Sequence, residues 1–120
     1  QRRDFVRIPV SLSLEYRVEN GAKSEETFHT GVIRDLSGGG AQLASKRKLV
    51  KGTILQVKFS LPEDLIVCKA KVMWVYTEVK EQKETYLIGL KFIDINERLR
   101  ERIIRYVFKR QRELIQKGVL

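Results

Sequence analysis

The stretch IPVSLSLEYRV, residues 8–18, decides the fold, because its side chains alternate between apolar and polar. From Val10 to Val18 every second residue is apolar, and the residues between them are serine, glutamate and arginine. A period of two places one set of side chains on a buried face and the other set toward solvent. The stretch therefore predicts a half-buried β-strand.

Five further segments read as short strands separated by turn signals. These strands are expected at about residues 25–34, 40–44, 55–59, 66–76 and 86–92. The turn signals include Asn20-Gly21 and the serine and glycines at 37–40, while the charged segment EVKEQKE, residues 78–84, is expected to be a loop. Short strands with closely spaced turns predict a small antiparallel barrel.

The period changes from two to about 3.6 after the last strand. Asp94 followed three residues later by Glu97 has the spacing of a capping box, and Gly118 is a stop signal. Apolar residues recur between them at helical spacing: Leu99, Ile103, Ile104, Val107, Phe108, Leu114 and Ile115. The expected fold class is thus mainly β, a six-stranded antiparallel β-barrel followed by a C-terminal amphipathic α-helix. We divide the chain into an arm (1–8), a barrel (9–93) and a helix (94–120).

Chain length and net charge limit the classes of function that this protein can have. The chain has 120 residues, which suits one domain, and a net charge of +9 from 24 basic and 15 acidic residues. More than half of the excess lies in residues 96–120, and such a balance indicates an anionic partner. No apolar run is long enough to span a membrane, and a single cysteine, Cys68, suits a reducing cytoplasm. Because the chain begins with Gln1, an upstream domain is expected to precede it.

Residues for catalysis are scarce. The only histidine, His29, has no cluster of carboxylates or cysteines around it in the sequence, so neither a metal site nor a general base is expected. Ser37 does not lie in a nucleophile-elbow pattern, and the triple glycine after it lacks the Lys-Ser/Thr of a P-loop. We therefore expect no enzyme activity and no cofactor.

The segment QRRDFVRIP, residues 1–9, concentrates three arginines ahead of a proline. Pro9 disfavours helix at Ile8, so the segment is expected to be extended or irregular. The guanidinium groups of Arg2, Arg3 and Arg7 match phosphate oxygens or the O6/N7 edge of guanine, and they stack on bases. The segment is either a nucleotide clamp or a solubilising linker.

The segment DLSGGG, residues 35–40, follows a predicted strand. The Asp35 carboxylate can accept hydrogen bonds from the N1–H and N2–H₂ edge of guanine, and the Ser37 hydroxyl and nearby backbone N–H groups suit phosphate. Glycines at 38, 39 and 40 permit close approach of a ligand and positive φ. The alternative is an Asx-type turn with a glycine hairpin.

Together and in this order, the two segments resemble the motifs of the PilZ domain family, bacterial receptors for the second messenger cyclic di-GMP. The RxxxR motif falls on Arg3 and Arg7, and the D/N-x-S-x-x-G motif falls on Asp35, Ser37 and Gly40. The stretch YLIGLKF, residues 86–92, is similar to the last strand of the family. The long basic helix resembles that of flagellar-brake-type members, in which a companion domain precedes the barrel.

The resemblance implies a cytoplasmic receptor that binds cyclic di-GMP on the outside of the barrel. The ligand would order the arginine arm and signal to an upstream domain or a downstream partner, such as the flagellar motor or polysaccharide machinery. Motility, exopolysaccharide and biofilm control are equally compatible outputs. Arg2, beside Arg3, suggests a second, intercalated ligand molecule. In similar domains an aromatic residue can pack against a base at the place of Trp74, but its parity with Val72 and Tyr76 favours core packing.

Two alternatives come from other functional classes. The charge and small β fold also suit an RNA- or DNA-binding barrel, although its strands lack the exposed alternating aromatic residues that stack bases. The basic helix would also suit a ligand-free interaction domain, including a homodimer formed through that helix.

Overall fold

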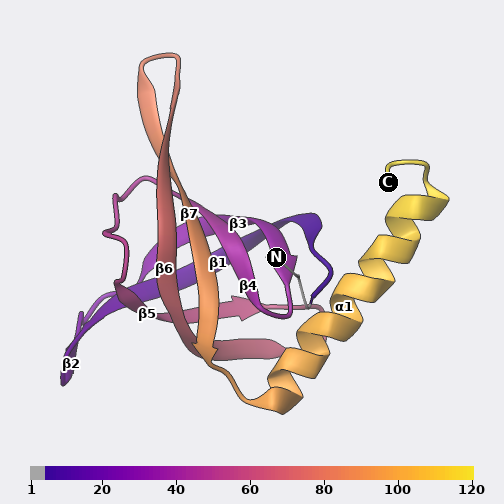
Figure 1. Cartoon of the computed structure of the whole chain (residues 1–120), viewed down its shortest axis with the longest axis horizontal. Helices are drawn as coiled ribbons and strands as arrows, with labels where there is room; N and C mark the ends of the chain where they lie inside the picture. The colour runs from indigo at the N-terminus through magenta and orange to yellow at the C-terminus, as the bar shows by residue number, and fades with distance from the viewer. Residues whose placement is uncertain (1–4) are drawn as a thin grey trace.

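The structure is a computed structural model that describes residues 5–120, except for the side chain of Asn20. Within this range the chain forms seven strands and one helix (Figure 1). These are β1 (Ile8–Asn20), β2 (Lys23–Ser24), β3 (His29–Ser37), β4 (Gly40–Ser45), β5 (Ile54–Ser60), β6 (Leu65–Lys80), β7 (Lys83–Asp94) and α1 (Glu97–Gln116).

Six of the strands close into a ring. The antiparallel order is β1-β3-β4-β7-β6-β5, and β5 pairs with β1 to complete the circle. The two-residue β2 extends β1 through the expected turn at Asn20-Gly21, where Gly21 has a φ of 59°. The six-stranded antiparallel barrel followed by a helix is therefore confirmed.

The interior of the ring is filled by the apolar set of the alternating strands. Leu14 and Tyr16 of β1 are almost completely buried, as are Leu55 and Val57 of β5. The Tyr16 hydroxyl lies 2.8 Å from the Ser45 hydroxyl, so the largest buried side chain keeps a hydrogen-bond partner. The barrel is thus a packed core, and any ligand site must lie on its outside or at its rim.

The β6–β7 hairpin is longer than expected, and residues 78–84 are not a loop. Both strands continue through the charged segment and project beyond the barrel (Figure 1). Only Glu81 and Gln82 form the turn, with φ of 50° and 65°. Two successive residues of positive φ make a tight turn whose twist matches antiparallel strands, so strand pairing continues as far as Lys80 and Lys83.

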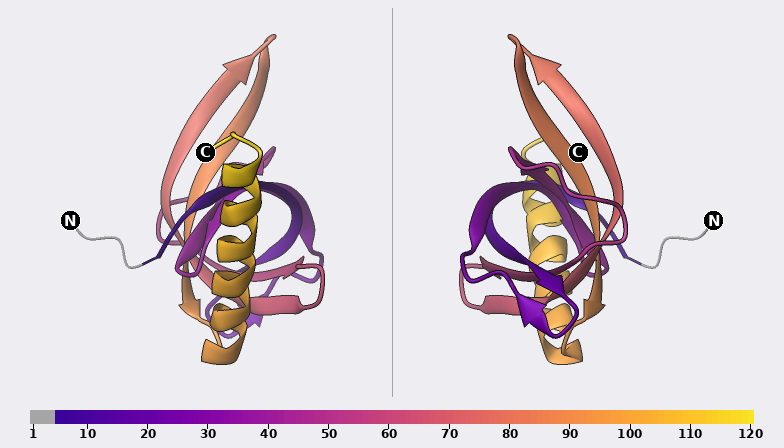
Figure 2. Two further views of the ribbon diagram at one scale, coloured as in Figure 1. Left: turned by 90° about the vertical axis from the view of Figure 1, so that its right-hand side faces the viewer. Right: turned by 90° about the vertical axis from the view of Figure 1, so that its left-hand side faces the viewer.

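Helix α1 lies alongside the barrel (Figure 2). Its N-cap is Asn96, whose side chain accepts a hydrogen bond of 2.8 Å from the N–H of Arg98, so the expected cap at Asp94 is wrong. Gly118, with a φ of 76°, ends the helix as predicted. Ile103 and Val107 are the helix residues buried against the barrel. Within residues 5–120 no helix has the length and apolar character needed to cross a membrane.

Candidate functional site

A β-bulge turns Asp35 to the outside of the barrel. Ile33 pairs with Leu43 and Asp35 pairs with Gln42, so Arg34 is an extra residue in β3. Ile33 is fully buried, while Arg34 is exposed and Asp35 is half-buried. A bulge re-aims the side chains that follow it, which explains how an aspartate can stand beside the buried Leu36 without entering the core.

Arg7 and Asp35 form an ion pair across the start of β1 and the end of β3. An Nη1 hydrogen of Arg7 is donated to Oδ1 of Asp35. The two side chains remain 37% and 25% exposed, so both stay accessible to a ligand. The structure therefore brings together two residues from the two sequence motifs, 28 positions apart.

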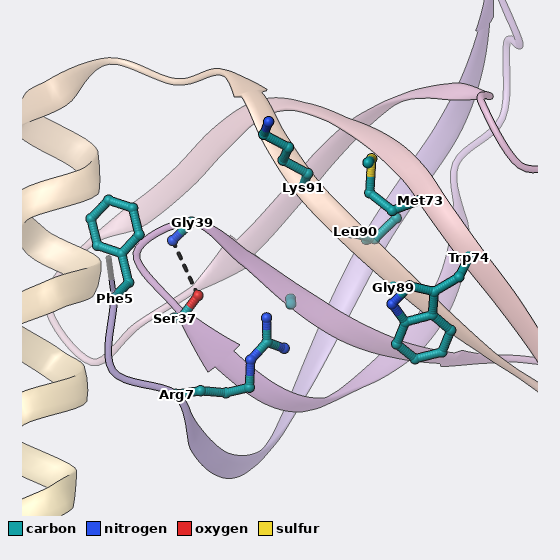
Figure 3. A pocket seen from close by; sticks show the side chains of 10 residues that line it. Phe5, Arg7, Ser37, Gly39, Met73, Trp74, Gly89, Leu90 and Lys91 are labelled. Atoms are coloured by element: carbon teal, nitrogen blue, oxygen red, sulfur yellow. Dashed lines mark hydrogen bonds between the residues drawn. The ribbon is translucent and has the colours of Figure 1, made fainter. Parts of the chain in front are cut away.

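Ser37 organises the turn between β3 and β4. Its buried hydroxyl accepts hydrogen bonds from the N–H groups of Gly39 (3.1 Å) and Gly40 (3.2 Å), as Figure 3 shows for Gly39. The same hydroxyl donates to the carbonyl oxygen of Gly40 at 3.4 Å. One hydroxyl offers one donor and two acceptor sites, so the turn uses all of them. A direct contact between this hydroxyl and phosphate would require one of these bonds to open.

The three glycines after Ser37 are required by close approach. None of them has positive φ, so the conformational reason expected from the sequence is wrong. A Cβ on Gly40 would come within 2.1 Å of the carbonyl oxygen of Leu90. A Cβ on Gly38 or Gly39 would lie 2.9 Å from the ring of Phe5. The glycines therefore let β7 and the arm pack directly against the turn.

Phe5 anchors the arm, a role that the sequence analysis missed. Its ring packs on Gly38 and Gly39, and Figure 3 shows it beside Gly39. The ring centre also lies 5.5 Å from the guanidinium carbon of Arg100 in α1. Ile8, expected to belong to the arm, is buried and begins β1. An isolated phenylalanine among arginines was the available signal. The predicted binding residues Arg2 and Arg3 lie outside the residues that the structure describes.

A pocket of about 290 Å³ opens at the barrel rim between the arm, the glycine turn and strands β6 and β7 (Figure 3). Arg7 and Ser37 line it, together with Trp74. Trp74 is 44% exposed, so the expectation of core packing is wrong. The reason is a second bulge: Val72 pairs with Leu90 and Trp74 with Gly89, so the extra Met73 reverses the parity of the strand.

Lys91 and Met73 also line the pocket and were not predicted. Lys91 lies between the apolar residues Leu90 and Phe92 of the predicted strand at 86–92, so the alternation of β7 could have revealed it. Met73 could not have been found, because no local signal marks the bulge. The pocket thus combines cationic groups with an aromatic face.

The other candidate groups take structural positions. His29 lies in β3 beside Tyr16, with its ring centre 5.6 Å away, and 3.5 Å from a carboxylate oxygen of Glu25. Burial raises the pKa of the Cys68 thiol to about 12, so it is protonated at neutral pH. In residues 5–120 no group of three His, Cys, Asp or Glu side chains is arranged to hold a metal ion.

Comparison with known proteins agrees with the fold. The PilZ domain profile matches residues 1–109, so the chain belongs to the PilZ domain family, whose members are non-enzymatic cyclic di-GMP receptors. No match was found among curated proteins.

Solved structures repeat the architecture. The PilZ domain of Escherichia coli YcgR with c-di-GMP is 16% identical with a TM-score of 0.71, and the match covers 98% of each chain. The inhibitor of motility MotI/DgrA of Bacillus subtilis is 20% identical with a TM-score of 0.77, covering 94% of this chain and 53% of that one. The K. pneumonia MrkH–c-di-GMP complex is 21% identical with a TM-score of 0.69, covering 98% and 56%. This chain thus spans about half the length of MotI and MrkH.

Proposed function

We propose that this domain binds cyclic di-GMP at the pocket between the arm, the glycine turn and strands β6 and β7. The observation that carries the proposal is the ion pair between Arg7 and Asp35, because Arg7 lines the pocket together with Trp74 and Lys91. Guanidinium and ammonium groups suit phosphate, the aspartate suits the N–H edge of guanine, and the indole offers a face for a base. Membership of the PilZ family supports the same ligand.

The ion pair between Arg7 and Asp35 suggests how the site is prepared. In the absence of ligand the pair holds the arginine over the barrel, and an exposed pair of this kind contributes about 1 kcal/mol or less to stability. The guanidinium can therefore exchange its contact with Asp35 for one with a phosphate, and the carboxylate can exchange its contact with Arg7 for one with a guanine. Either exchange loses little free energy. Arg3, the other arginine of the motif, would supply a second guanidinium to the same ligand.

Calorimetric titration with cyclic di-GMP tests the proposal, with GTP and cyclic di-AMP as ligand controls. Arg3→Ala, Arg7→Ala and Asp35→Asn should each abolish binding or weaken it by more than tenfold, with unfolding midpoints close to wild type. Arg112→Ala, an exposed arginine on α1, is the matched control and should bind normally. If wild type gave no heat with cyclic di-GMP, or Arg7→Ala bound as tightly as wild type, the assignment would be wrong.

We further propose that Arg2 stacks on a second, intercalated ligand molecule. The proposal rests on the extra cation next to Arg3 in the sequence. Titration should give two ligands per chain for wild type and one for Arg2→Ala. A stoichiometry of one for both proteins would contradict it.

Signal transmission would use the arm. Phe5 connects the arm to the glycine turn and, through Arg100, to α1. A ligand that binds Arg7 therefore binds a segment that is already in contact with the helix. We propose that the bound ligand orders the arm ahead of β1, residues 1–7, and thereby passes the signal to an adjoining domain or partner in the cytoplasm. Hydrogen exchange at the amides of residues 5–7 should slow on ligand addition; unchanged exchange at saturating ligand would contradict this step.

A further inference from the structure

Helix α1 carries an apolar stripe that the barrel does not cover. Ile103 and Val107 face the barrel, whereas Phe108 and Ile115 are 43% and 54% exposed. The stripe, here called the α1 seam, consists of the apolar residues Ile104, Phe108 and Ile115 and of the polar Gln111, which lies between the last two. Their spacing of four, three and four residues is that of the contact positions in a two-helix coiled coil. The far end of α1 projects from the barrel, so the seam continues beyond it (Figure 1).

The beginning of the seam opens into a groove of about 280 Å³. The groove is lined by Phe5 and Val6 of the arm, by Gly38, and by three residues of α1: Ile104, Val107 and Phe108. An apolar groove of this kind accepts an inserted side chain from a partner, in the manner of a helix that packs its apolar face into a cleft. A flat lipid surface would leave such a groove unfilled.

The exposed edge of the seam is strongly basic. Arg105, Lys109 and Arg112 are exposed on α1, and no described carboxylate makes an ion pair with any of them. In coiled coils the positions that flank the apolar contact select the partner by charge. Arg105 and Arg112, which directly follow the contact positions Ile104 and Gln111, favour acidic flanking residues. They disfavour an antiparallel pairing with a second copy of this chain, because the same arginines would face each other.

We propose that the α1 seam and its groove dock an amphipathic helix of another protein, with large apolar residues at its contact positions and glutamate or aspartate beside them. Coulomb attraction orients that helix, and burial of Phe108 and Ile115 against it supplies the affinity. The docking itself does not depend on the proposed function. Its control by ligand does, because Phe5 and Val6 belong to the arm that Arg7 connects to Asp35.

The probe is a synthetic helical peptide of about three heptads with leucine at the a and d positions and glutamate at e and g. Fluorescence anisotropy should show binding by wild type and no binding of the same peptide with lysine in place of glutamate. Phe108→Asp with Ile115→Asp should weaken binding at least tenfold, and Arg105→Glu with Arg112→Glu should reverse the preference toward the lysine peptide. Val50→Asp, which alters a still more exposed apolar residue in the β4–β5 loop, is the control.

The outcomes distinguish an acidic helix from a second copy of this chain and from a lipid surface. Equal binding of both peptides, or full affinity in the Phe108/Ile115 variant, would overturn the proposal. Concentration-dependent dimers in sedimentation that the same variant abolishes would identify a second copy as the occupant and overturn it as well. So would binding to phosphatidylglycerol vesicles that needs Phe108 and Ile115 while the glutamate peptide does not bind. Circular dichroism verifies that each variant is folded, and titration with cyclic di-GMP in a separate cell keeps a failure of the ligand site distinct.

Discussion

The indole of Trp74 covers Gly89 so closely that a Cβ on that glycine would lie 2.1 Å from Nε1 of the indole. The two residues are cross-strand partners in β6 and β7, next to the bulge at Met73 (Figure 3). The glycine of the YLIGLKF stretch therefore makes room for an aromatic side chain at the rim of the pocket. Because the chain has one tryptophan, its fluorescence reports on this place alone.

Gly89→Ala should displace the indole and weaken cyclic di-GMP binding about tenfold, since base–aromatic stacking contributes about 1–3 kcal/mol per base. The emission maximum of Trp74 should shift in the free variant, and its response to ligand should fall. Tyr76→Ala, an exposed aromatic residue on the same strand, is the control and should bind as wild type. Unchanged emission and unchanged affinity in Gly89→Ala would show that the indole has no part in binding.

Ser37→Ala should destabilise the domain by about 1–3 kcal/mol, because the N–H groups of Gly39 and Gly40 lose their acceptor in a buried turn. Urea unfolding measures the change. Ser13→Ala removes an exposed hydroxyl from β1 and should leave stability within about 0.5 kcal/mol of wild type. A Ser37→Ala variant as stable as Ser13→Ala would mean that the turn does not depend on this hydroxyl.

Gly40→Ala and Gly39→Ala should differ sharply in stability. At Gly40 the new methyl meets the backbone of Leu90, which cannot move without opening the pairing of β4 with β7, so a loss of about 3 kcal/mol or more is expected. At Gly39 it meets only the Phe5 ring, which can shift with the arm, and the loss should stay below about 1 kcal/mol. Equal unfolding midpoints for the two variants would contradict this assignment.

Stability should fall in acid through Glu25. Its carboxylate receives two hydrogen bonds from Arg47, of 2.9 and 2.8 Å, and one from the N–H of Val18, and these lower its pKa from 4.5 to about 2. A depressed pKa stabilises the folded state above the unfolded value, and this contribution disappears as pH falls from about 4.5 to 2.

Urea unfolding at several pH values measures this dependence. Glu25→Gln should be less stable than wild type at pH 7, and the difference should shrink toward pH 2. Glu63→Gln, at an exposed carboxylate in the β5–β6 turn, provides the comparison. A constant difference between Glu25→Gln and wild type across this range would exclude Glu25 as the titrating group.

Much of the fold could be read from the sequence. Alternation in residues 8–18 defines β1, and the change of period after β7 defines α1, because both patterns depend on which side chains one element buries. The two sequence motifs proposed for binding were also visible, since Arg7 and Asp35 are polar residues at places where a strand begins or ends. Such motifs can be recognised without knowing which strand pairs with which.

The placement of the site depended on the tertiary structure. The bulges at Arg34 and Met73 arise in the pairing of β3 with β4 and of β6 with β7. The alternation within one strand therefore could not show that Asp35 and Trp74 both face outward. The contacts of Phe5 with Gly38 and Gly39 likewise join segments remote in sequence. Sequence by itself determined the elements and the charges, because these depend on local periodicity and composition. The fold decided which side chains meet, because register and close packing depend on all strands together.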